Sequence, residues 1–358
     1  MTAPILVVED DPFPRLLQVI LDPAAPAARV AAFGDFFAHD LPDFGGWCAA
    51  LRSRLGKLNP ATVRLVADQG ALAASLAGAS IAVVESLRVG EKELAVANGL
   101  RVIQKYGTIT ANIDTAACAQ RGIPVLTLRR RANMACAEHA LAMMLALARR
   151  LCETDGLISV EQLRAAGFAP AAFDRAHTAN ANWARIPGLR TLHGSQLGIV
   201  GMGEIGRELA LRAAACGMRI VYSQRSRLPA ADETRYGAGY APLAALLAES
   251  DYVSLHLPGN AATRGIIGQR ELEHLKPGAM LINISRAELV DRTALLDALR
   301  TGRLSGFATD TPYEEPGRAD DSLLALRNVI MTPHLAAQPR FNALGDFEEM
   351  LINLAGFI

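Results

Sequence analysis

Short apolar runs alternate with helix-like segments over the first third of the chain. Pro4–Val8 and the runs at residues 81–84 and 100–103 predict strands, and the segment 91–97 between the last two predicts a helix. A further strand-like run, Ile123–Leu126, follows. Strands that alternate with helices are typical of a parallel sheet whose faces are covered by helices.

A second alternation of the same kind occupies the C-terminal half. Ala135–Leu151 predicts a long helix with apolar residues on nearly every face, and residues 153–190 lose the periodicity, as an irregular insertion would. The pattern returns with the strand Gln196–Val200 and continues to about residue 335. Because 358 residues exceed what one hydrophobic core usually supports, the predicted fold class is α/β, with two doubly wound parallel-sheet domains.

The acidic residues after the first strand raise one alternative. Glu9–Asp11 follow Pro4–Val8, and this start is similar to that of a bacterial response-regulator receiver. A receiver also needs a phosphorylatable Asp at the end of its third strand, expected near residues 50–57, but residues 49–56 contain no carboxylate. A strand followed by acids is common in α/β folds, so the receiver is disfavoured.

Composition and charge narrow the class of partner. Lys plus Arg and Asp plus Glu number 36 each, so the balance favours neither nucleic acid nor an anionic membrane as a partner. No apolar stretch reaches the roughly 18 to 20 uncharged residues of a membrane span, and no signal-like segment opens the chain. The five cysteines lack metal-ligand spacing, so we expect no metal site and mostly buried thiols. We expect a cytoplasmic protein with a small-molecule partner.

A glycine-rich loop joins the strand Gln196–Val200 to the helix that follows it. In such a strand–loop–helix unit, the first glycine allows a tight turn, the second lets a pyrophosphate approach the backbone, and the third packs the helix against the strand. The loop therefore predicts a dinucleotide site. Its contacts are expected to be Gly201, Gly203, Glu204, Ile205 and Gly206.

The end of the next strand bears on which nicotinamide cofactor is used. An NAD enzyme usually places Asp or Glu there, about 20 positions after the loop, to bind the 2′-hydroxyl of the ribose. Here the chain has Gln224, Arg225, Ser226 and Arg227. A neutral side chain beside arginines attracts a 2′-phosphate, which a carboxylate would repel. NADP is therefore favoured, with NAD as the alternative, and Gln224, Arg225 and Ser226 are the expected contacts.

Several ordered motifs in the rest of the chain point to one family. They are Ser250–Pro258, Leu275–Arg286, Leu289–Asp291, Asp310–Pro316 and Thr332–His334, together with Asn112–Asp114, Arg121–Val125 and Ala137–Leu141. The series covers residues 80–340 and resembles the D-isomer-specific 2-hydroxyacid dehydrogenases, the family of phosphoglycerate, hydroxypyruvate and D-lactate dehydrogenases. The resemblance implies hydride transfer between a nicotinamide cofactor and a small 2-keto or 2-hydroxy acid.

The resemblance assigns three catalytic residues. Arg286 would hold the substrate carboxylate and polarise the carbonyl, and His334, paired with Glu315, would be the acid/base. Reduction of a keto acid needs both functions, since an acid must protonate the oxygen as the hydride arrives. A neighbouring carboxylate raises the pKa of an imidazole, which keeps that proton available.

The same resemblance implies contacts to the cofactor and to the substrate. Asp310 would hold the nicotinamide amide, and Pro258 and Thr263 would line the cofactor side. The loop whose backbone N–H groups would receive the substrate carboxylate consists of Gly107, Thr108 and Ile109.

The resemblance also implies a discontinuous arrangement of domains. Residues 1–126 and 336–358 would form a flavodoxin-like substrate domain, and residues 127–335 a Rossmann NAD(P)-binding domain inserted into it; a homodimer is the expected assembly. The chain departs from the family pattern in three places, one of which is Arg129–Arg131 in place of a Pro/Gly-type segment. Ile109 and Ala287 stand where glycine is usual, which changes the expected shape of the substrate pocket.

Three adjacent arginines, Arg129, Arg130 and Arg131, follow the strand at residues 123–128. Adjacent cations repel one another, so negative charge is expected nearby. In one interpretation, acidic side chains of the other domain or of a partner subunit supply this negative charge, or solvent alone screens the arginines. In the other interpretation, the negative charge is a second anionic group on the substrate, held by the guanidinium of Arg130.

Two alternative functions share the predicted fold. A dinucleotide-sensing regulatory protein of the co-repressor type is one, because fold alone does not fix function. The presence of Arg286, Glu315 and His334 favours an enzyme instead. A formate dehydrogenase is the other alternative, and it would normally carry Gln in place of Glu315.

Overall fold

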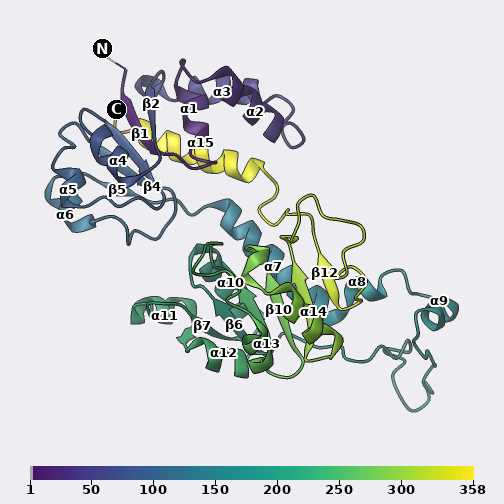
Figure 1. Ribbon diagram of the computed structural model, residues 1–358. Coiled ribbons are helices and arrows are strands. Elements are labelled where there is room, and N and C mark those ends of the chain that lie inside the picture. The colour runs from purple at the N-terminus through teal and green to yellow at the C-terminus, as the bar shows by residue number, and fades with distance from the viewer. Residues whose placement is uncertain (1–2) are drawn as a thin grey trace. The chain divides into compact units, whose positions relative to one another are not determined.

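The computed structural model describes residues 3–358, which fold into two compact units (Figure 1). Unit 1 consists of the chain up to Ala135 together with Ala337–Ile358, and unit 2 consists of Cys136–Ala336. Helix α7 (Arg131–Arg149) carries the chain out of unit 1 and into unit 2. Unit 2 is therefore inserted between two sequence segments of unit 1, as the fold prediction required.

Unit 1 is built on a parallel sheet of five strands in the order β2-β1-β3-β4-β5. This is the strand order of flavodoxin-like folds, so the predicted class of this unit is confirmed. Its strands are β1 (Ile5–Glu9), β2 (Thr62–Val66), β3 (Ile81–Val84), β4 (Val102–Lys105) and β5 (Val125–Leu126).

Helices cover both faces of this sheet. Along β1, Leu6 and Val8 join one hydrophobic core and Val7 joins the other, as the two-residue repeat of a strand requires. The first core also contains side chains of α1, α2, α3 and α15, and the second contains side chains of α4, α5 and α6. The helices of unit 1 are α1 (Leu16–Leu21), α2 (Ala27–Phe37), α3 (Phe44–Arg52), α4 (Gln69–Ser75), α5 (Glu91–Leu94), α6 (Thr115–Gln120) and α15 (Phe341–Ala355), with a 3₁₀ turn η1 (Gly56–Leu58).

The C-terminal helix α15 belongs to unit 1 because of its amphipathic pattern. Phe347, Met350, Leu351 and Leu354 recur at three- and four-residue spacing and are buried in the first core. Phe347 also stacks on Tyr106, with ring centroids 5.5 Å apart. This packing fixes the helix on unit 1 although more than half of the chain separates it from the strands it covers.

Unit 2 contains a parallel sheet of seven strands in the order β12-β11-β10-β9-β6-β7-β8. The strand order reverses between β6 and β9, and ligands of doubly wound sheets bind at the carboxyl ends of the strands beside such a reversal. The predicted Rossmann-type sheet is thus confirmed. Its strands are β6 (Gln196–Val200), β7 (Arg219–Ser223), β8 (Ala238–Tyr240), β9 (Tyr252–Leu255), β10 (Ala279–Asn283), β11 (Leu304–Thr309) and β12 (Val329–Met331).

The faces of this second sheet are also covered by helices. Leu197 and Ile199 of β6 share a core with α7 and α10, whereas Val200 shares a core with α12, α13 and α14. The remaining helices of unit 2 are α8 (Leu151–Thr154), α9 (Val160–Ala165), α10 (Glu204–Ala215), α11 (Ala230–Tyr236), α12 (Leu243–Glu249), α13 (Gln269–His274) and α14 (Arg292–Arg300), with a 3₁₀ turn η2 (Ala287–Leu289). Among residues 3–358, no helix combines the length and the apolarity that a membrane crossing needs.

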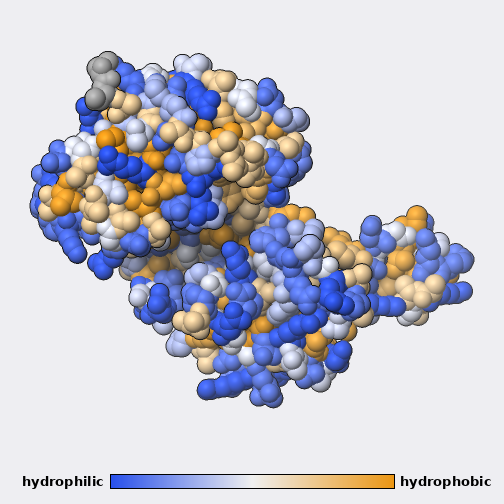
Figure 2. Space-filling model, turned by 45° about the horizontal axis from the view of Figure 1, so that its top comes forward, coloured by the Kyte–Doolittle hydropathy of each residue, from blue (hydrophilic) through white to orange (hydrophobic). Residues whose placement is uncertain are grey.

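The irregular insertion predicted at residues 153–190 is confirmed. Between residues 155 and 190 the chain forms one short helix, α9, and it extends away from the sheet of unit 2 (Figure 1). Apolar side chains lie on the surface of this segment (Figure 2), and Ile158 is 81% exposed.

The third strand of unit 1 lies elsewhere than the receiver argument assumed. The chain between β1 and β2 forms helices, so residues 49–56 fall in α3 and the turns after it, and the third strand is β3. The residue that follows β3 is Glu85, whose Oε1 accepts a 2.6 Å hydrogen bond from Nη1 of Arg130. A receiver needs an aspartate at this strand end, and here the residue is a glutamate that is hydrogen-bonded to an arginine. This is the structural reason why a receiver is disfavoured.

Residues 127–135, assigned from the sequence to the nucleotide-binding domain, group with unit 1. Leu128 is buried in the first core, and the backbone N–H of Arg131 donates to Asp346 of α15 at 3.0 Å. These contacts explain why the division between the units falls inside α7.

Candidate active site

The glycine loop after β6 has the geometry that its sequence suggests. Gly201 has φ +99°, and a Cβ there would lie 2.5 Å from the carbonyl oxygen of His256. A Cβ on Gly206 would lie 2.4 Å from the carbonyl oxygen of Gly201, so any side chain would push α10 away from β6. Gly203 is the N-cap of α10 and supplies no side-chain cap, which leaves the first-turn N–H groups to an outside acceptor.

A cavity of about 560 Å³ lies beside this loop, at the carboxyl ends of β6, β7 and β9, and we call it the cofactor cavity. It occupies the switch point of the sheet, where a dinucleotide is expected. Residues predicted from the sequence that line it are Gly201, Gly203, Gln224, Arg225, Ser226, Pro258 and Thr263. Glu204 and Ile205 begin α10 directly beside it.

The side chain of Gln224 is bound to the glycine loop. Its Oε1 accepts a hydrogen bond from the backbone N–H of Met202 at 3.1 Å, and its Nε2 donates to the carbonyl oxygen of Ser226 at 2.6 Å. Arg227 is paired with Glu233 at 2.8 Å, and Arg225 is exposed. Arg225 is therefore the cation of this group that faces solvent at the cavity.

His256 also lines the cofactor cavity, and the sequence analysis did not assign it. Its Nε2 lies 2.9 Å from Oγ of Ser254, two residues earlier along β9 and so on the same face. Burial lowers the pKa of His256 to about 4, so the ring is neutral near pH 7. The sequence did contain a signal for this residue, because His256 follows an apolar run that reads as a strand and lies two positions after Ser254, which places the two side chains on one face.

His334 and Glu315 form the predicted pair. Nδ1 of His334 lies 3.0 Å from Oε1 and 3.1 Å from Oε2 of Glu315. His334 follows β12 and has φ +55°, which is a left-handed conformation. Histidine adopts this conformation several times more often than most other residues with a side chain. With Nδ1 on the carboxylate, the other ring nitrogen is oriented away from Glu315 and can serve a ligand.

Asp310 is fully buried at the end of β11 and binds the segment that carries His334. Its Oδ1 accepts hydrogen bonds from Oγ1 of Thr332 at 2.6 Å and from the N–H of Leu335 at 2.9 Å, and its Oδ2 accepts from the N–H of Ala336 at 2.7 Å. The structure therefore gives this carboxylate three hydrogen-bond donors in the turn on either side of His334, and Nε2 of His139 lies 3.6 Å from its Oδ1.

Arg286 lies just beyond the end of β10, with its guanidinium exposed. Its Nη1 donates to the carbonyl oxygen of Ser285 at 2.6 Å, and within residues 3–358 it forms no ion pair. Nδ2 of the buried Asn283 holds the Arg286 carbonyl at 2.8 Å. A Cβ on Gly259 would lie 2.8 Å from Cγ of Arg286, so this glycine, which the sequence analysis passed over, makes room for the arginine.

Sheet topology brings the predicted residues of unit 2 to one edge. Arg286, Asp310 and His334 follow β10, β11 and β12, which are adjacent and parallel, and the glycine loop follows β6 in the same sheet. The carboxyl ends of parallel strands lie on the same side, so the cofactor cavity and the catalytic candidates share that edge.

The predicted substrate residues of unit 1 lie at the carboxyl end of its own sheet. Gly107 follows β4 with φ +145°, and its carbonyl oxygen accepts from the N–H of Leu128 at 2.9 Å. Thr108 and Ile109 continue this loop.

The arginine run has acidic partners in its own unit. Arg130 pairs with Glu85 at 2.6 Å and lies over the ring of Tyr106, with 4.6 Å from its Cζ to the ring centroid. Arg131 pairs with the buried Asp346 and with Glu349, each at 2.8 Å. The carboxylates that pair with Arg130 and Arg131 come from the end of β3 and from α15, which the sequence analysis placed in the other domain, so the prediction of acids from that domain is met for these two residues. What changes is the unit to which the arginines themselves belong.

Comparisons with known proteins agree with this architecture. The family model described as "D-isomer specific 2-hydroxyacid dehydrogenase, NAD binding domain" matches residues 141–336. The chain is similar to glyoxylate reductase of Thermococcus litoralis, 36% identical over 271 residues that cover 75% of this chain and 77% of that protein. It is also similar to D-3-phosphoglycerate dehydrogenase of Archaeoglobus fulgidus, 31% identical over 282 residues, 77% of this chain and 49% of that protein.

A solved structure with the same fold is D-mandelate dehydrogenase of Rhodotorula graminis in its holo form. The TM-score is 0.57 with 19% identity, and the match covers 99% of this chain and 93% of that chain. Both units of the fold are therefore found together in a solved protein. Among residues 3–358, no group of three or more His, Cys, Asp or Glu side chains is placed to hold a metal ion.

Proposed function

Because this chain belongs to the D-isomer-specific 2-hydroxyacid dehydrogenase family, and so is a nicotinamide-dependent hydroxy acid oxidoreductase, we propose that it reduces a small 2-keto acid with NADPH. The relatives named glyoxylate reductase make glyoxylate the first substrate to test. The single observation that carries the proposal is the contact of His334 with Glu315 at the same sheet edge as Arg286, which is exposed and forms no ion pair within unit 2.

Arg286 binds the carboxylate and the carbonyl oxygen of the substrate. Its position after β10 is fixed through Asn283, while its guanidinium carries a positive charge that no acid of unit 2 neutralises. A guanidinium fork suits a planar carboxylate, and a cation near the carbonyl stabilises the negative charge that develops on its oxygen.

His334 supplies the proton to that oxygen. Glu315 contacts Nδ1, which fixes the tautomer and the orientation of the ring, so Nε2 is the atom that carries the proton to the substrate.

The residues around the cofactor cavity fit a dinucleotide. An uncapped helix N-terminus suits a pyrophosphate, and a cavity of about 560 Å³ is in the size range of cofactor sites. Gly201, Gly203 and Gly206 would hold the pyrophosphate, and Gln224, Arg225 and Ser226 the adenosine ribose. The nicotinamide, when bound, supplies the hydride. A 2′-phosphate would meet the exposed Arg225 and no carboxylate at Gln224, which favours NADPH.

Several finer predictions accompany this proposal. Unit 2 binds the cofactor and unit 1 contributes substrate contacts through Gly107, Thr108, Ile109 and Arg130. A homodimer and a cytoplasmic location are proposed with them, and light scattering tests the former.

A panel of keto acids tests the function. Purified protein is mixed with glyoxylate, hydroxypyruvate, phosphohydroxypyruvate or pyruvate, and the loss of nicotinamide absorbance is followed with NADPH and with NADH. We expect turnover of at least one of these acids, fastest with NADPH. Binding of NADPH without turnover of any keto acid would instead indicate the dinucleotide-sensing regulatory protein.

A further inference from the structure

One histidine of unit 2, His139, contacts the turn that carries His334, and the proposed reaction has not yet used it. It lies on helix α7, and its Nε2 is 3.1 Å from Oγ1 of Thr332 and 3.6 Å from Oδ1 of Asp310. The side chain of His139 is 19% exposed, so most of the imidazole is removed from water. Thr332 is two positions before His334, which places this contact next to the proposed acid/base.

The hydrogen bonds of this group run in one direction. Oγ1 of Thr332 is 2.6 Å from Oδ1 of Asp310, and an ionised carboxylate only accepts, so the hydroxyl donates to it. A hydroxyl has one proton, so Thr332 accepts at its other contact and Nε2 of His139 is the donor there. A hydroxyl that accepts one hydrogen bond is polarised and donates a stronger one. His139 therefore fixes the rotation of the Thr332 hydroxyl and strengthens its bond to Asp310.

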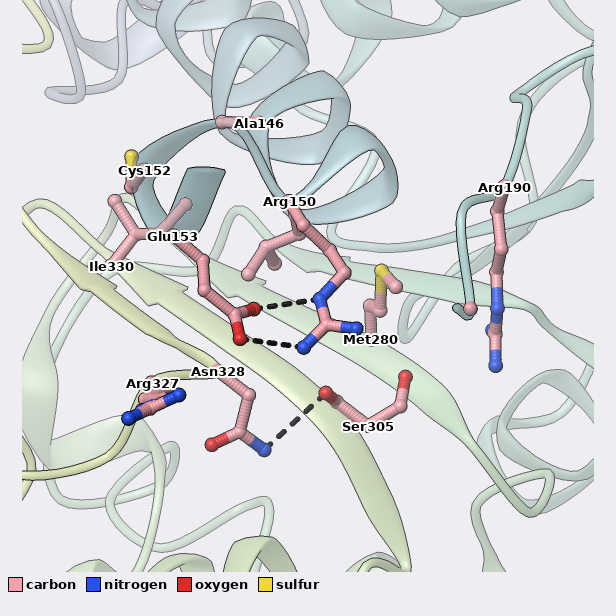
Figure 3. A pocket seen from close by; sticks show the side chains of 12 residues that line it. Ala146, Arg150, Cys152, Glu153, Arg190, Met280, Ser305, Arg327, Asn328 and Ile330 are labelled. Carbon is pink, nitrogen blue, oxygen red and sulfur yellow. Dashed lines mark hydrogen bonds and ion pairs between the residues drawn. The ribbon is translucent and has the colours of Figure 1, made fainter. Parts of the chain in front are cut away.

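Helix α7 is a rigid support for this imidazole. The helix packs so closely on β11 that a Cβ on Gly306 would lie 3.1 Å from Cδ2 of Leu147. Beyond the last turn of the helix, Nε and Nη2 of Arg150 each donate to the carboxylate of Glu153 at 2.6 Å (Figure 3). The helix thus contacts the first half of β11 through Leu147 and the residue just beyond that strand through His139. Its position along the sheet is fixed by these contacts.

The turn around His334 needs support because its backbone conformation is costly. His334 has φ +55°, and a residue with a Cβ keeps such a conformation only where the surrounding contacts impose it. On one side of His334, the N–H groups of Leu335 and Ala336 bind Asp310. On the other side, the contact with this carboxylate is made by the Thr332 hydroxyl, whose orientation depends on His139.

We propose that His139 is a positioning residue for the acid/base His334 and acts through the hydroxyl of Thr332. The inference rests on the proposed function, because it gives His139 a part in the proton transfer by His334. Its role is orientation, since the imidazole holds the turn in the arrangement from which Nε2 of His334 reaches the substrate oxygen. Loss of His139 should therefore lower kcat and leave the binding of the keto acid and of NADPH nearly unchanged.

Three substitutions of His139 test this role by steady-state kinetics on the best keto acid found. Phenylalanine keeps a ring without a donor, glutamine places an amide N–H near the position of Nε2, and asparagine is too short to do so. We expect His139→Phe and His139→Asn to lower kcat up to about tenfold with little change in KM, and His139→Gln to keep most of the activity. Equal kcat in the wild type and in His139→Phe overturns the proposal, as does a His139→Gln variant no better than His139→Asn.

Controls show that the proteins compared are folded and that the effect is local. Urea unfolding and fluorescence titration of NADPH are measured for each variant, and the comparison of His139→Gln with His139→Asn stands even if His139→Phe does not fold. His274→Phe, at the exposed end of α13, changes a histidine outside this network and should keep the wild-type kcat.

A double substitution tests the path through Thr332. If His139 acts through this hydroxyl, Thr332→Val already includes its effect, so adding His139→Phe to Thr332→Val should change kcat little. Losses that multiply in the double variant would show that His139 acts by another route and would overturn the proposal.

The pH profile separates positioning from acid/base catalysis. A positioning residue lowers the plateau of kcat and leaves the pH at which kcat changes as it is in the wild type, because His334 still carries the proton. Loss of one limb of the profile in His139→Phe would make His139 itself the acid and would overturn the positioning role.

Nitrogen NMR of labelled histidine examines the network without any reaction. The neutral ring of His139 should carry its proton on Nε2 in the NADPH-bound wild type, and Thr332→Val should shift that resonance. A wild type that turns over no keto acid would reject the proposed function, whereas this spectrum still judges the network. A proton on Nδ1 in place of Nε2 would overturn the inference by itself.

Discussion

The carboxylate of Asp310 accepts a 2.6 Å hydrogen bond from the hydroxyl of Thr332, two residues before His334. The same carboxylate accepts the N–H groups of Leu335 and Ala336, which follow that histidine. A buried acid of β11 thus holds the turn that carries His334 from both sides. Asp310 is a positioning residue for His334 in this arrangement, whatever contact it makes with the nicotinamide.

Asp310→Asn should lower kcat more than it raises KM. An amide places an N–H group against one of the backbone N–H donors, and a displacement of about 1 Å at a catalytic group can cost roughly 10²-fold in rate. Steady-state kinetics and urea unfolding measure both effects. Thr332→Val removes one hydrogen bond and should show a smaller loss in each; an unchanged kcat in Asp310→Asn would exclude the positioning role.

His334→Gln and Arg286→Ala should abolish most turnover while NADPH binding persists. Loss of a positioned acid costs about 10² to 10⁴ in rate, and both residues are predicted to act on the substrate and not on the phosphate loop. Stopped-flow or steady-state rates and fluorescence titration of NADPH provide the two measurements. His274→Gln, at the exposed end of α13, is a matched control. Near-normal kcat in His334→Gln would show that another residue is the acid.

Gln224→Asp combined with Arg225→Gln should reverse the preference for NADPH. The new carboxylate repels a 2′-phosphate and can accept a hydrogen bond from a 2′-hydroxyl, and a hydrogen bond to a charged group is worth about 1.5 to 3 kcal/mol. The ratio of kcat/KM for the two cofactors should therefore shift by about 10-fold or more. Arg227→Gln, which breaks the contact with Glu233, is the control. A wild-type kcat/KM that is higher with NADH contradicts the prediction from the outset.

The features predicted from the sequence are those that local chemistry dictates. Gly201 and Gly206 can be recognised from a motif of six consecutive residues. Gly201 has a positive φ and Gly206 makes a close backbone contact, and each of these requires a residue without a Cβ. Arg286, Asp310 and His334 each follow an apolar run that reads as a strand, and parallel strands bring their carboxyl ends to one edge.

Contacts between residues that are far apart in the chain could not be predicted from the sequence. Arg131 and Asp346 are 215 positions apart, so nothing near Arg131 indicates that a buried acid compensates it. Helix α2 was not predicted for a different reason. Only Phe37 among its residues is fully buried, so α2 carries little of the apolar periodicity by which a helix is recognised.

Arg130→Ala tests the predicted contact with a second anionic group of the substrate. If Arg130 binds such a group, KM should rise for phosphohydroxypyruvate and stay nearly unchanged for pyruvate, because pyruvate has one carboxylate for Arg286 alone. The substitution breaks the contact between Arg130 and Glu85 whichever acid is the substrate. Any structural effect of that loss therefore cancels in the ratio of the two KM values. Equal changes in KM for the two acids would return Arg130 to a structural role.

Arg131→Met should destabilise unit 1 strongly at neutral pH. Burial raises the pKa of Asp346, and the N–H and guanidinium of Arg131 oppose that shift. Without the guanidinium, the carboxyl group, which has no exposed surface, must either stay ionised beside a methionine or take up a proton, and breaking a buried pair in this way costs about 3 to 5 kcal/mol of unfolding free energy.

The pH dependence of this deficit follows from the direction of the pKa shift. An acid whose folded pKa lies above its unfolded value binds more protons in the folded state, so stability rises as the pH falls through that range. Urea unfolding at pH 7 and at pH 5 should therefore show a smaller deficit for Arg131→Met at the lower pH, where a larger fraction of the folded variant carries a proton on Asp346. Adding Asp346→Asn should restore part of the stability at pH 7 and remove the pH dependence. A deficit of the same size at both pH values would mean that Arg131 stabilises the unit by packing against α15, not by compensating the buried charge.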